Sequence, residues 1–148
     1  MNKKAELYWN QFWKEKEKPL SVTAWQFGFE PDELAQLVID GIKTATCSSY
    51  LAYQIENESI PAVDDYSIIL NSHDDPVAII RTAAVQVMPF SEVPESFAIA
   101  EGEGDISYVY WRKSHEVFFK NELATMGKKF SEEMLVVCER FELIDVKI

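Results

Sequence analysis

The sequence predicts one α+β domain in which helices flank a small, mainly antiparallel sheet that can curl into a barrel. Helical and strand-like patterns alternate along the chain, in the order helix, strand, helix, several strands, helix, strand. The 148 residues are 47% hydrophobic, which is enough for one substantial core. No repeat or low-complexity tract divides the chain. We therefore expect a single domain over residues 1–148.

The first predicted element is an amphipathic helix over about residues 4–18. Apolar side chains recur at helical spacing, namely Ala5, Tyr8, Trp9, Phe12 and Trp13. A run of charged residues follows, and Pro19 ends the pattern because proline cannot continue a helix. We expect the aromatic stripe to pack on its own domain, with a partner-binding face as the alternative.

The next segment predicts a strand, a helix and a second strand. Residues 22–29 are aromatic and β-branched, as strands are. Pro31 fits the first position of a helix, and Gly41 fits its C-terminal stop. Residues 43–49 then leave the helix end and enter a strand, and residues 54–65 are rich in breakers and predict a loop.

The middle of the chain predicts a hairpin. Residues 66–70 and 77–82 have strand patterns, and the polar segment 71–76 between them is typical of a turn. Residues 84–88 extend the sheet after a bend, and two prolines bracket the loop that follows.

A long helix and a closing strand complete the chain. One face of the helix carries Tyr108, Trp111, His115, Phe118 and Glu122. Either Asp105 or Ser107 serves as its N-cap. Residues 135–146 are rich in strand-forming side chains and predict the last strand.

Composition limits the possible partners and the compartment. The formal net charge of −11 disfavours long duplex DNA and general phosphate-backbone binding. The two cysteines do not make a disulfide framework, which fits the cytoplasm. No apolar run approaches the roughly 20 residues that span a bilayer, and no secretory signal pattern begins the chain. We expect a cytoplasmic protein without a membrane partner, and the sequence leaves the oligomeric state open.

The segment 41–49 holds the densest set of potential nucleophiles. Lys43 does not belong to a phosphate-binding loop, because Ile42 stands where that motif requires glycine. A partly buried Lys43 could act as a base toward a hydroxyl, and the alternative is an exposed lysine at a helix C-terminus. In an extended strand Lys43 and Thr46 lie on opposite faces, so a turn or bulge is needed to bring them together.

The second polar cluster is Glu101-Gly102-Glu103-Gly104-Asp105. Neighbouring carboxylates disfavour joint ionisation, so the pKa of one of them should rise, as an acid/base role requires. A calcium loop is disfavoured, because Ile106 and Arg112 stand where that loop needs glycine and glutamate. No Cys/His spacing indicates zinc, and we interpret His115 as a core residue. We therefore expect neither a metal nor a cofactor.

These motifs together resemble the ASCH domain family. The resemblance rests on Gly41-Ile42-Lys43-Thr44-Ala45-Thr46, residues 61–70, the Glu101–Asp105 cluster and Tyr110-Trp111-Arg112-Lys113-Ser114-His115. The resemblance covers the chain from about residue 20 to the end, and within the family the chain is similar to the longer bacterial subgroup. The family fold is a small β-barrel flanked by helices, similar to the PUA domain. Asp64-Asp65 stands where the family often has Gly-Asp.

The resemblance implies two functions. Some bacterial members are amidohydrolases that deacetylate N4-acetylcytidine with a lysine, a threonine three residues later and a distant glutamate. Lys43 and Thr46 match the first two, and Glu103 matches the third, with Glu101 as its rival. Thr46 would then be the nucleophile, Lys43 would activate it and Glu103 would handle protons at the leaving amine.

The same resemblance also implies an RNA-binding or RNA-cleaving PUA-like module. In either case the expected ligand is a modified nucleoside or a short RNA. We expect the ligand to be contacted by Trp25, Thr44, Ser48, Ser49, Tyr50, Glu101 and Asp105. A third hypothesis is a protein-interaction domain that uses the N-terminal aromatic helix.

Overall fold

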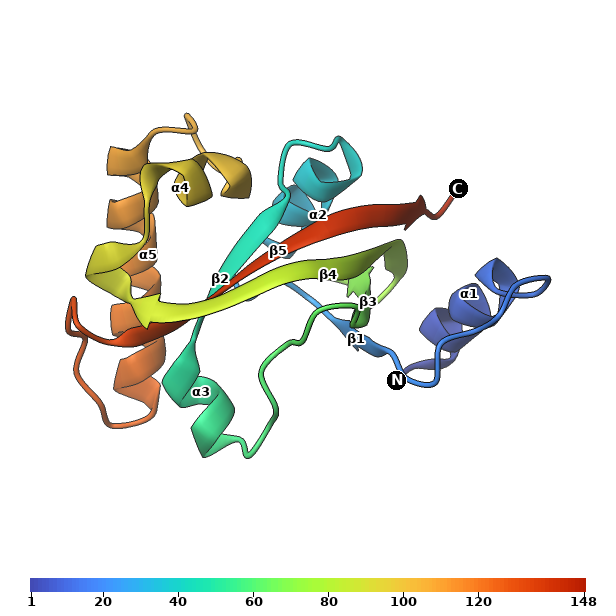
Figure 1. Ribbon diagram of the computed structural model, residues 1–148, viewed down its shortest axis with the longest axis horizontal. Coiled ribbons are helices and arrows are strands. Elements are labelled where there is room, and N and C mark those ends of the chain that lie inside the picture. The colour runs from blue at the N-terminus through green and yellow to red at the C-terminus, as the bar shows by residue number, and fades with distance from the viewer.

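The computed structural model describes residues 1–148 and contains one five-stranded sheet (Figure 1). Its strands are β1 (Thr23–Trp25), β2 (Ala45–Ser49), β3 (Tyr66–Leu70), β4 (Pro76–Pro89) and β5 (Leu135–Val146). The helices are α1 (Lys3–Phe12), α2 (Pro31–Ile39), α3 (Tyr50–Ile55), α4 (Glu95–Glu101) and α5 (Tyr108–Thr125), with a 3₁₀ turn η1 at Phe90–Glu92. This arrangement confirms the predicted α+β class.

The sheet is a half-barrel with the strand order β1-β3-β4-β5-β2. Three of its four pairings are antiparallel, and β1 pairs parallel to β3. The register between β4 and β5 shifts at Ile79/Ile80 and again at Thr82/Ala84. Such irregularities bend long strands and increase their twist. Figure 1 shows β4 and β5 as two long strands side by side. β1 and β2 are the two edges and do not pair with each other, so the barrel stays open between them.

The N-terminal helix packs on its own domain, as expected. Ala5, Tyr8 and Trp9 are buried against Ile68 and Ile79 of the sheet. The helix ends at Phe12, however, and not near residue 18. The predicted continuation was wrong because the charged run after Trp13 is exposed and has no apolar face to bury.

Two short helices were not predicted, and one strand is shorter than expected. α3 has six residues and buries none of them, so it has no apolar periodicity to recognise. α4 follows directly on Pro94, in a segment for which the sequence predicted no element. The first strand includes only Thr23–Trp25, because the chain leaves the sheet before Phe27 packs against α2.

The long C-terminal helix begins where the capping signal places it. The Ser107 side chain accepts a hydrogen bond from the N–H of Tyr110 at 3.1 Å, so Ser107 and not Asp105 is the N-cap. The buried face of α5 carries Trp111, His115 and Phe119. None of the helices is both long and apolar enough to cross a membrane.

Candidate functional site

Lys43 lies in the turn between α2 and β2. Gly41 takes φ +74°, which ends α2. The N–H groups of Ile42 and Lys43 both donate to the carbonyl of Leu37, at 2.9 and 3.0 Å. β2 begins only at Ala45, so the alternation of the strand does not decide where Lys43 points. Its side chain is fully buried.

The end of α4 lies directly against this turn. The Thr44 N–H donates to the carbonyl of Ala100 at 2.7 Å, which joins the two segments. Gly102 follows Glu101 with φ +67°. A β-carbon at Gly102 would overlap the carbonyl of Ile42, so glycine is what allows the close approach.

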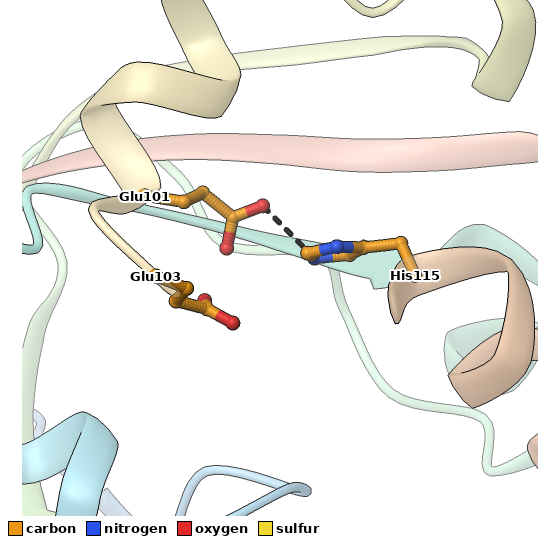
Figure 2. A group of neighbouring side chains, drawn as sticks. All are labelled: Glu101, Glu103 and His115. Atoms are coloured by element: carbon orange, nitrogen blue, oxygen red, sulfur yellow. Dashed lines mark ion pairs between the residues drawn. The ribbon is translucent and has the colours of Figure 1, made fainter. Parts of the chain in front are cut away.

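Lys43 bridges two glutamates. Its Nζ lies 2.9 Å from Oε1 of Glu101 and 2.5 Å from Oε2 of Glu103. The Glu101 side chain is 1% exposed and that of Glu103 is 12% exposed, so Glu103 is the member that faces solvent. Figure 2 shows Glu101 at the end of α4 and Glu103 in the loop after it, with His115 approaching from α5.

His115 completes a balanced group of four charges. Its Nε2 lies 3.0 Å from Oε2 of Glu101, and its Nδ1 lies 2.9 Å from the carbonyl of Trp111. Both ring nitrogens therefore face acceptors, and only the imidazolium can donate to both. The indole N–H of Trp111 also donates to Oε2 of Glu101, at 2.6 Å. Two cations thus offset two carboxylates in a buried setting.

The environment separates the pKa values of the two glutamates. Burial opposes ionisation of Glu101, but the charges of Lys43 and His115 bring its pKa well below the usual range. For Glu103, burial raises the pKa, and the charge of Lys43 only partly offsets it. Burial lowers the pKa of Lys43, but the two glutamates more than compensate and raise it. Burial likewise lowers the pKa of His115, and Glu101 raises it above its usual value.

Three of these residues also have the spacing of a metal site. Glu101, Glu103 and His115 each offer a ligand atom, and these atoms lie within 4.8 Å of one another. The Lys43 ammonium lies between the two carboxylates, so the position that suits a cation already holds a positive charge. A metal would have to displace Lys43 and deprotonate His115, so the donor set does not fit one as it stands.

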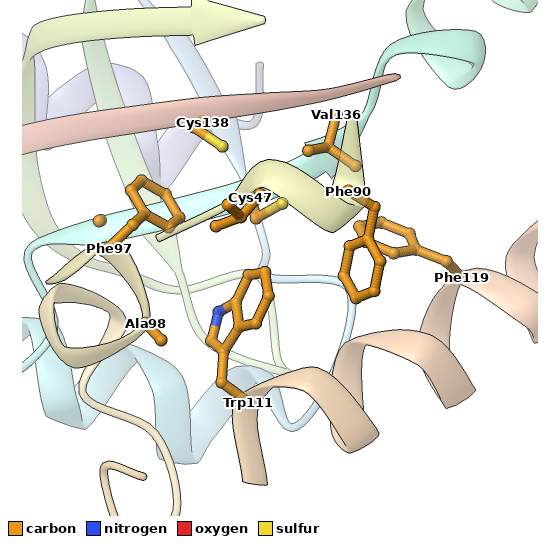
Figure 3. Packing of buried hydrophobic residues seen from close by; sticks show 10 residues of the cluster. Cys47, Phe90, Phe97, Ala98, Trp111, Phe119, Val136 and Cys138 are labelled. Carbon is orange, nitrogen blue, oxygen red and sulfur yellow. The ribbon is translucent and has the colours of Figure 1, made fainter. Parts of the chain in front are cut away.

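Aromatic packing holds this group in place. Trp111 stacks on His115 with ring centroids 4.4 Å apart and on Phe90 with centroids 5.4 Å apart. Figure 3 shows Trp111 and Phe90 beneath β2 and β5, with the thiols of Cys47 and Cys138 above them. The two cysteines are free and face each other across the β2–β5 pairing.

Two neighbouring cavities lie close to the charged group. The smaller, here called the inner pocket, has about 60 Å³ of space and is lined by Thr46, Glu101, Glu103, Ser114 and His115, with apolar walls that include Phe27 and Phe118. The larger, here called the outer cleft, has about 800 Å³. Both are lined by Phe27, Gly28, Thr46, Cys47 and Phe118, so Thr46 stands at their junction.

The structure brings together the three residues expected to be catalytic, but only two of them touch. Lys43 contacts Glu103, and both Glu103 and Thr46 line the inner pocket. The Thr46 hydroxyl forms no side-chain hydrogen bond, and Lys43 itself does not line the pocket. Lys43 lies in a turn two residues before β2 begins, so it need not point to the face opposite Thr46 as it would in a strand.

The residues expected to contact the ligand divide into two groups. Trp25 and Ser48 line the outer cleft, and Glu101 lines the inner pocket. Thr44, Ser49, Tyr50 and Asp105 line neither cavity.

Three of these outlying residues have structural contacts instead. The hydroxyl of Thr44 donates to the carbonyl of Ala100, and that of Ser49 caps α3 by accepting from the Ala52 N–H. The carboxylate of Asp105 accepts from the N–H of Ser107.

His115 is the member of the site that the sequence did not reveal. Its place on an aromatic helix face is typical of core histidines, and it is indeed 8% exposed. Its charge partner Glu101 is 14 residues earlier in a helix that was not predicted. The signal that could have identified it is the spacing of Trp111 and His115, four residues apart on one face of α5.

Comparison with known proteins assigns the family. The ASCH domain model matches residues 23–145. The ASCH domain of Lactobacillus crispatus JV V101 superposes with a TM-score of 0.90 at 30% identity, covering 97% of this chain and 95% of that one. Protein EF3133 of Enterococcus faecalis V583 gives a TM-score of 0.87 at 41% identity, over 99% and 91% of the two chains.

A more distant structure shares the fold alone. Hypothetical protein PH0355 has a TM-score of 0.52 at 18% identity, over 83% of this chain and 97% of that one. The search among curated proteins found no match. The family model and the two close structures agree with the resemblance seen in the motifs, and the chain belongs to the ASCH domain family.

Proposed function

We propose that the protein hydrolyses an amide on a modified nucleoside, with N4-acetylcytidine as the first candidate. The observation that supports this most directly is the position of Thr46 at the junction of two cavities of different size. The inner pocket has room for a small acyl group, and the outer cleft has the volume of sites that hold a nucleoside-sized ligand. A bond between acyl group and base would then lie beside the Thr46 hydroxyl.

The charge arrangement favours Glu103 over Glu101 as the acid/base group. Glu101 is fixed by contacts with Lys43, Trp111 and His115, and its pKa is lowered. Glu103 faces the pocket, and its burial raises its pKa, which brings the carboxyl nearer the range where it can accept and donate protons. Glu101 is therefore assigned a positioning role.

Lys43 can become a base only after it loses a proton, and Glu103 is the group that can take it. The proton passes along the 2.5 Å hydrogen bond from Lys43 to Glu103, which leaves a neutral amine and a neutral acid. The amine accepts the proton of Thr46 as its oxygen bonds to the acyl carbon. Glu103 gives its proton to the leaving nitrogen as the C–N bond breaks, which releases the free amine and leaves an acyl-threonine.

Water completes the cycle with the same groups. It adds to the acyl carbon and gives a proton to Glu103, while Lys43 returns a proton to the Thr46 oxygen as the ester bond breaks. Glu103 then returns its proton to Lys43, and the carboxylic acid leaves. No hydrogen bond joins Lys43 and Thr46, so the transfer between them requires a side-chain rotation or an intervening water.

The test is deacetylation of N4-acetylcytidine, followed by chromatography of the released cytidine. We expect turnover by the parent and losses of at least about 100-fold in Lys43→Ala, Thr46→Ala and Glu103→Ala, each checked for folding by circular dichroism. Thr125→Ala is the matched control, because Thr125 is exposed and lines neither cavity. Full activity in Thr46→Ala would exclude the threonine as nucleophile.

RNA binding is the second candidate, because the PUA-like fold of the family suggests an RNA-related ligand. Aromatic side chains in the outer cleft, Trp25 and Phe118 among them, offer surfaces on which a base can stack. Titration with short oligonucleotides at two salt concentrations tests it. Affinity that falls steeply with salt would indicate phosphate contacts and would favour this function over hydrolysis of a nucleoside.

A further inference from the structure

The outer cleft has negative charge and no basic side chain. Its acidic residues are Glu58, Asp65, Glu122 and Glu139, and no lysine or arginine lines it. None of these four carboxylates forms an ion pair. The inner pocket differs, because two cations offset its two glutamates.

One of these carboxylates is buried and a second is partly buried. Glu139 is 5% exposed, and its Oε2 accepts a hydrogen bond from the Thr82 hydroxyl at 2.7 Å. Oε1 of Glu122 is buried and has no hydrogen-bond partner. Burial raises the pKa of both groups, and the charge of Glu56 adds to the effect at Glu122. No lysine or arginine of the cleft offsets either charge, so an anion placed there would be repelled.

The rest of the lining suits an uncharged aromatic ligand. Trp25, Tyr53 and Phe118 present ring surfaces to the cleft. The hydroxyls of Ser48 and Tyr53, 3.1 Å apart, offer polar contacts of either direction. A nucleoside can satisfy both features, because its base stacks and its sugar hydroxyls form neutral hydrogen bonds.

Resting on the proposed function, we propose that Glu122 and Glu139 are specificity residues that exclude phosphate from the outer cleft. A free nucleoside then binds, while the corresponding nucleotide and RNA are repelled. The two carboxylates take no part in the chemical step, since neither lines the inner pocket.

The test compares cytidine with cytidine 5′-monophosphate by isothermal titration calorimetry, which measures binding without hydrolysis. We expect the monophosphate to bind at least about tenfold more weakly to the parent. The ratio of the two Kd values should fall several-fold in Glu122→Gln/Glu139→Gln. Glu92→Gln/Glu95→Gln is the matched control, because it removes two exposed charges that line neither cavity, and it should keep the ratio of the parent.

Salt gives a second readout with a defined sign. Raising KCl screens repulsion, so the affinity for the monophosphate should increase while that for cytidine stays constant. Equal or tighter binding of the monophosphate, an unchanged ratio in the double variant, or no binding of cytidine would each overturn the proposal. Because cytidine binding is measured without turnover, failed deacetylation would remove the proposed reaction and leave this selectivity standing.

Discussion

Replacement of Lys43 by methionine tests whether the buried charges depend on one another. Methionine keeps most of the apolar stem but removes the ammonium that lies between Glu101 and Glu103. Glu101 is buried and loses a charged hydrogen bond that water cannot replace, and the mostly buried Glu103 loses one that water replaces only in part. Breaking a buried ion pair in this way costs about 3–5 kcal/mol. We expect the lower end of this range, because Glu103 is partly exposed and Glu101 keeps its contacts with Trp111 and His115.

The measurement is urea unfolding at pH 7 and pH 5, followed by tryptophan fluorescence. An unpaired buried carboxyl has a higher pKa in the folded than in the unfolded state. It therefore lowers the free energy of unfolding more and more as pH rises above the pKa of the unfolded state. The destabilisation by Lys43→Met should therefore be smaller at pH 5. Lys43→Met/Glu103→Gln removes one of the two orphaned charges and should recover at least about 1 kcal/mol at pH 7.

Two results would refute this reasoning. A loss below about 1 kcal/mol at pH 7 would mean that water or a rearranged side chain solvates the carboxylates after the substitution. An equal loss at both pH values would mean that packing of the lysine stem, and not charge, accounts for the effect.

Three further predictions concern the surrounding framework. The pKa of His115 is higher in the folded than in the unfolded protein, so its protonation stabilises the fold at low pH. That stability is lost as pH rises through the pKa of the folded state. His115→Gln should therefore abolish a decline in melting temperature between neutral and mildly alkaline pH. Gly102→Ala should destabilise by about 2 kcal/mol or more in urea unfolding, since its β-carbon would overlap Ile42, whereas Gly127→Ala has open space and should lose only about 1 kcal/mol for its positive φ. Ser107→Ala removes the N-cap of α5 and should cost about 1 kcal/mol.

Each of these predictions has a contradicting outcome. A persistent alkaline decline in His115→Gln would assign the pH dependence to another group. Similar losses in the two glycine variants would show that backbone conformation alone, and not the contact with Ile42, matters at Gly102. An unchanged melting temperature in Ser107→Ala would mean that water satisfies the N–H of Tyr110 equally well.

The sequence predicted the larger elements of the fold because each has an internal signal. α5 has a polar cap and an apolar stripe, and the hairpin of β3 and β4 has two apolar strands around a polar turn. α3 lacks such a signal, because a six-residue helix without a buried face has no period. The end of α1 was also missed, since its charged continuation is compatible with a helix and only tertiary packing ends it at Phe12.

The charged group could be predicted only in part, because its contacts are long-range. Glycines in the Glu101–Asp105 cluster indicated a close approach of the backbone, and Gly102 indeed lies against Ile42. The partnership of Lys43 with Glu101 joins residues 58 positions apart and depends on how α4 ends. His115 is the core residue that the sequence predicted. Its ion pair with Glu101 was not predicted, because an aromatic helix face gives no sign of a charge partner from another element.

Because the sheet is open between β1 and β2, main-chain groups of both edge strands can contribute to ligand affinity, and side-chain substitutions do not measure that contribution. Both edge strands line the outer cleft, through Thr23–Trp25 on one side and Thr46–Ser48 on the other. An edge strand leaves main-chain N–H and carbonyl groups without a partner strand, and a base edge can pair with them. Alanine scanning leaves those groups intact, whereas replacing a single amide by an ester removes one donor. An amide-to-ester replacement in β1 or β2 is therefore the substitution that measures what one backbone N–H contributes to affinity.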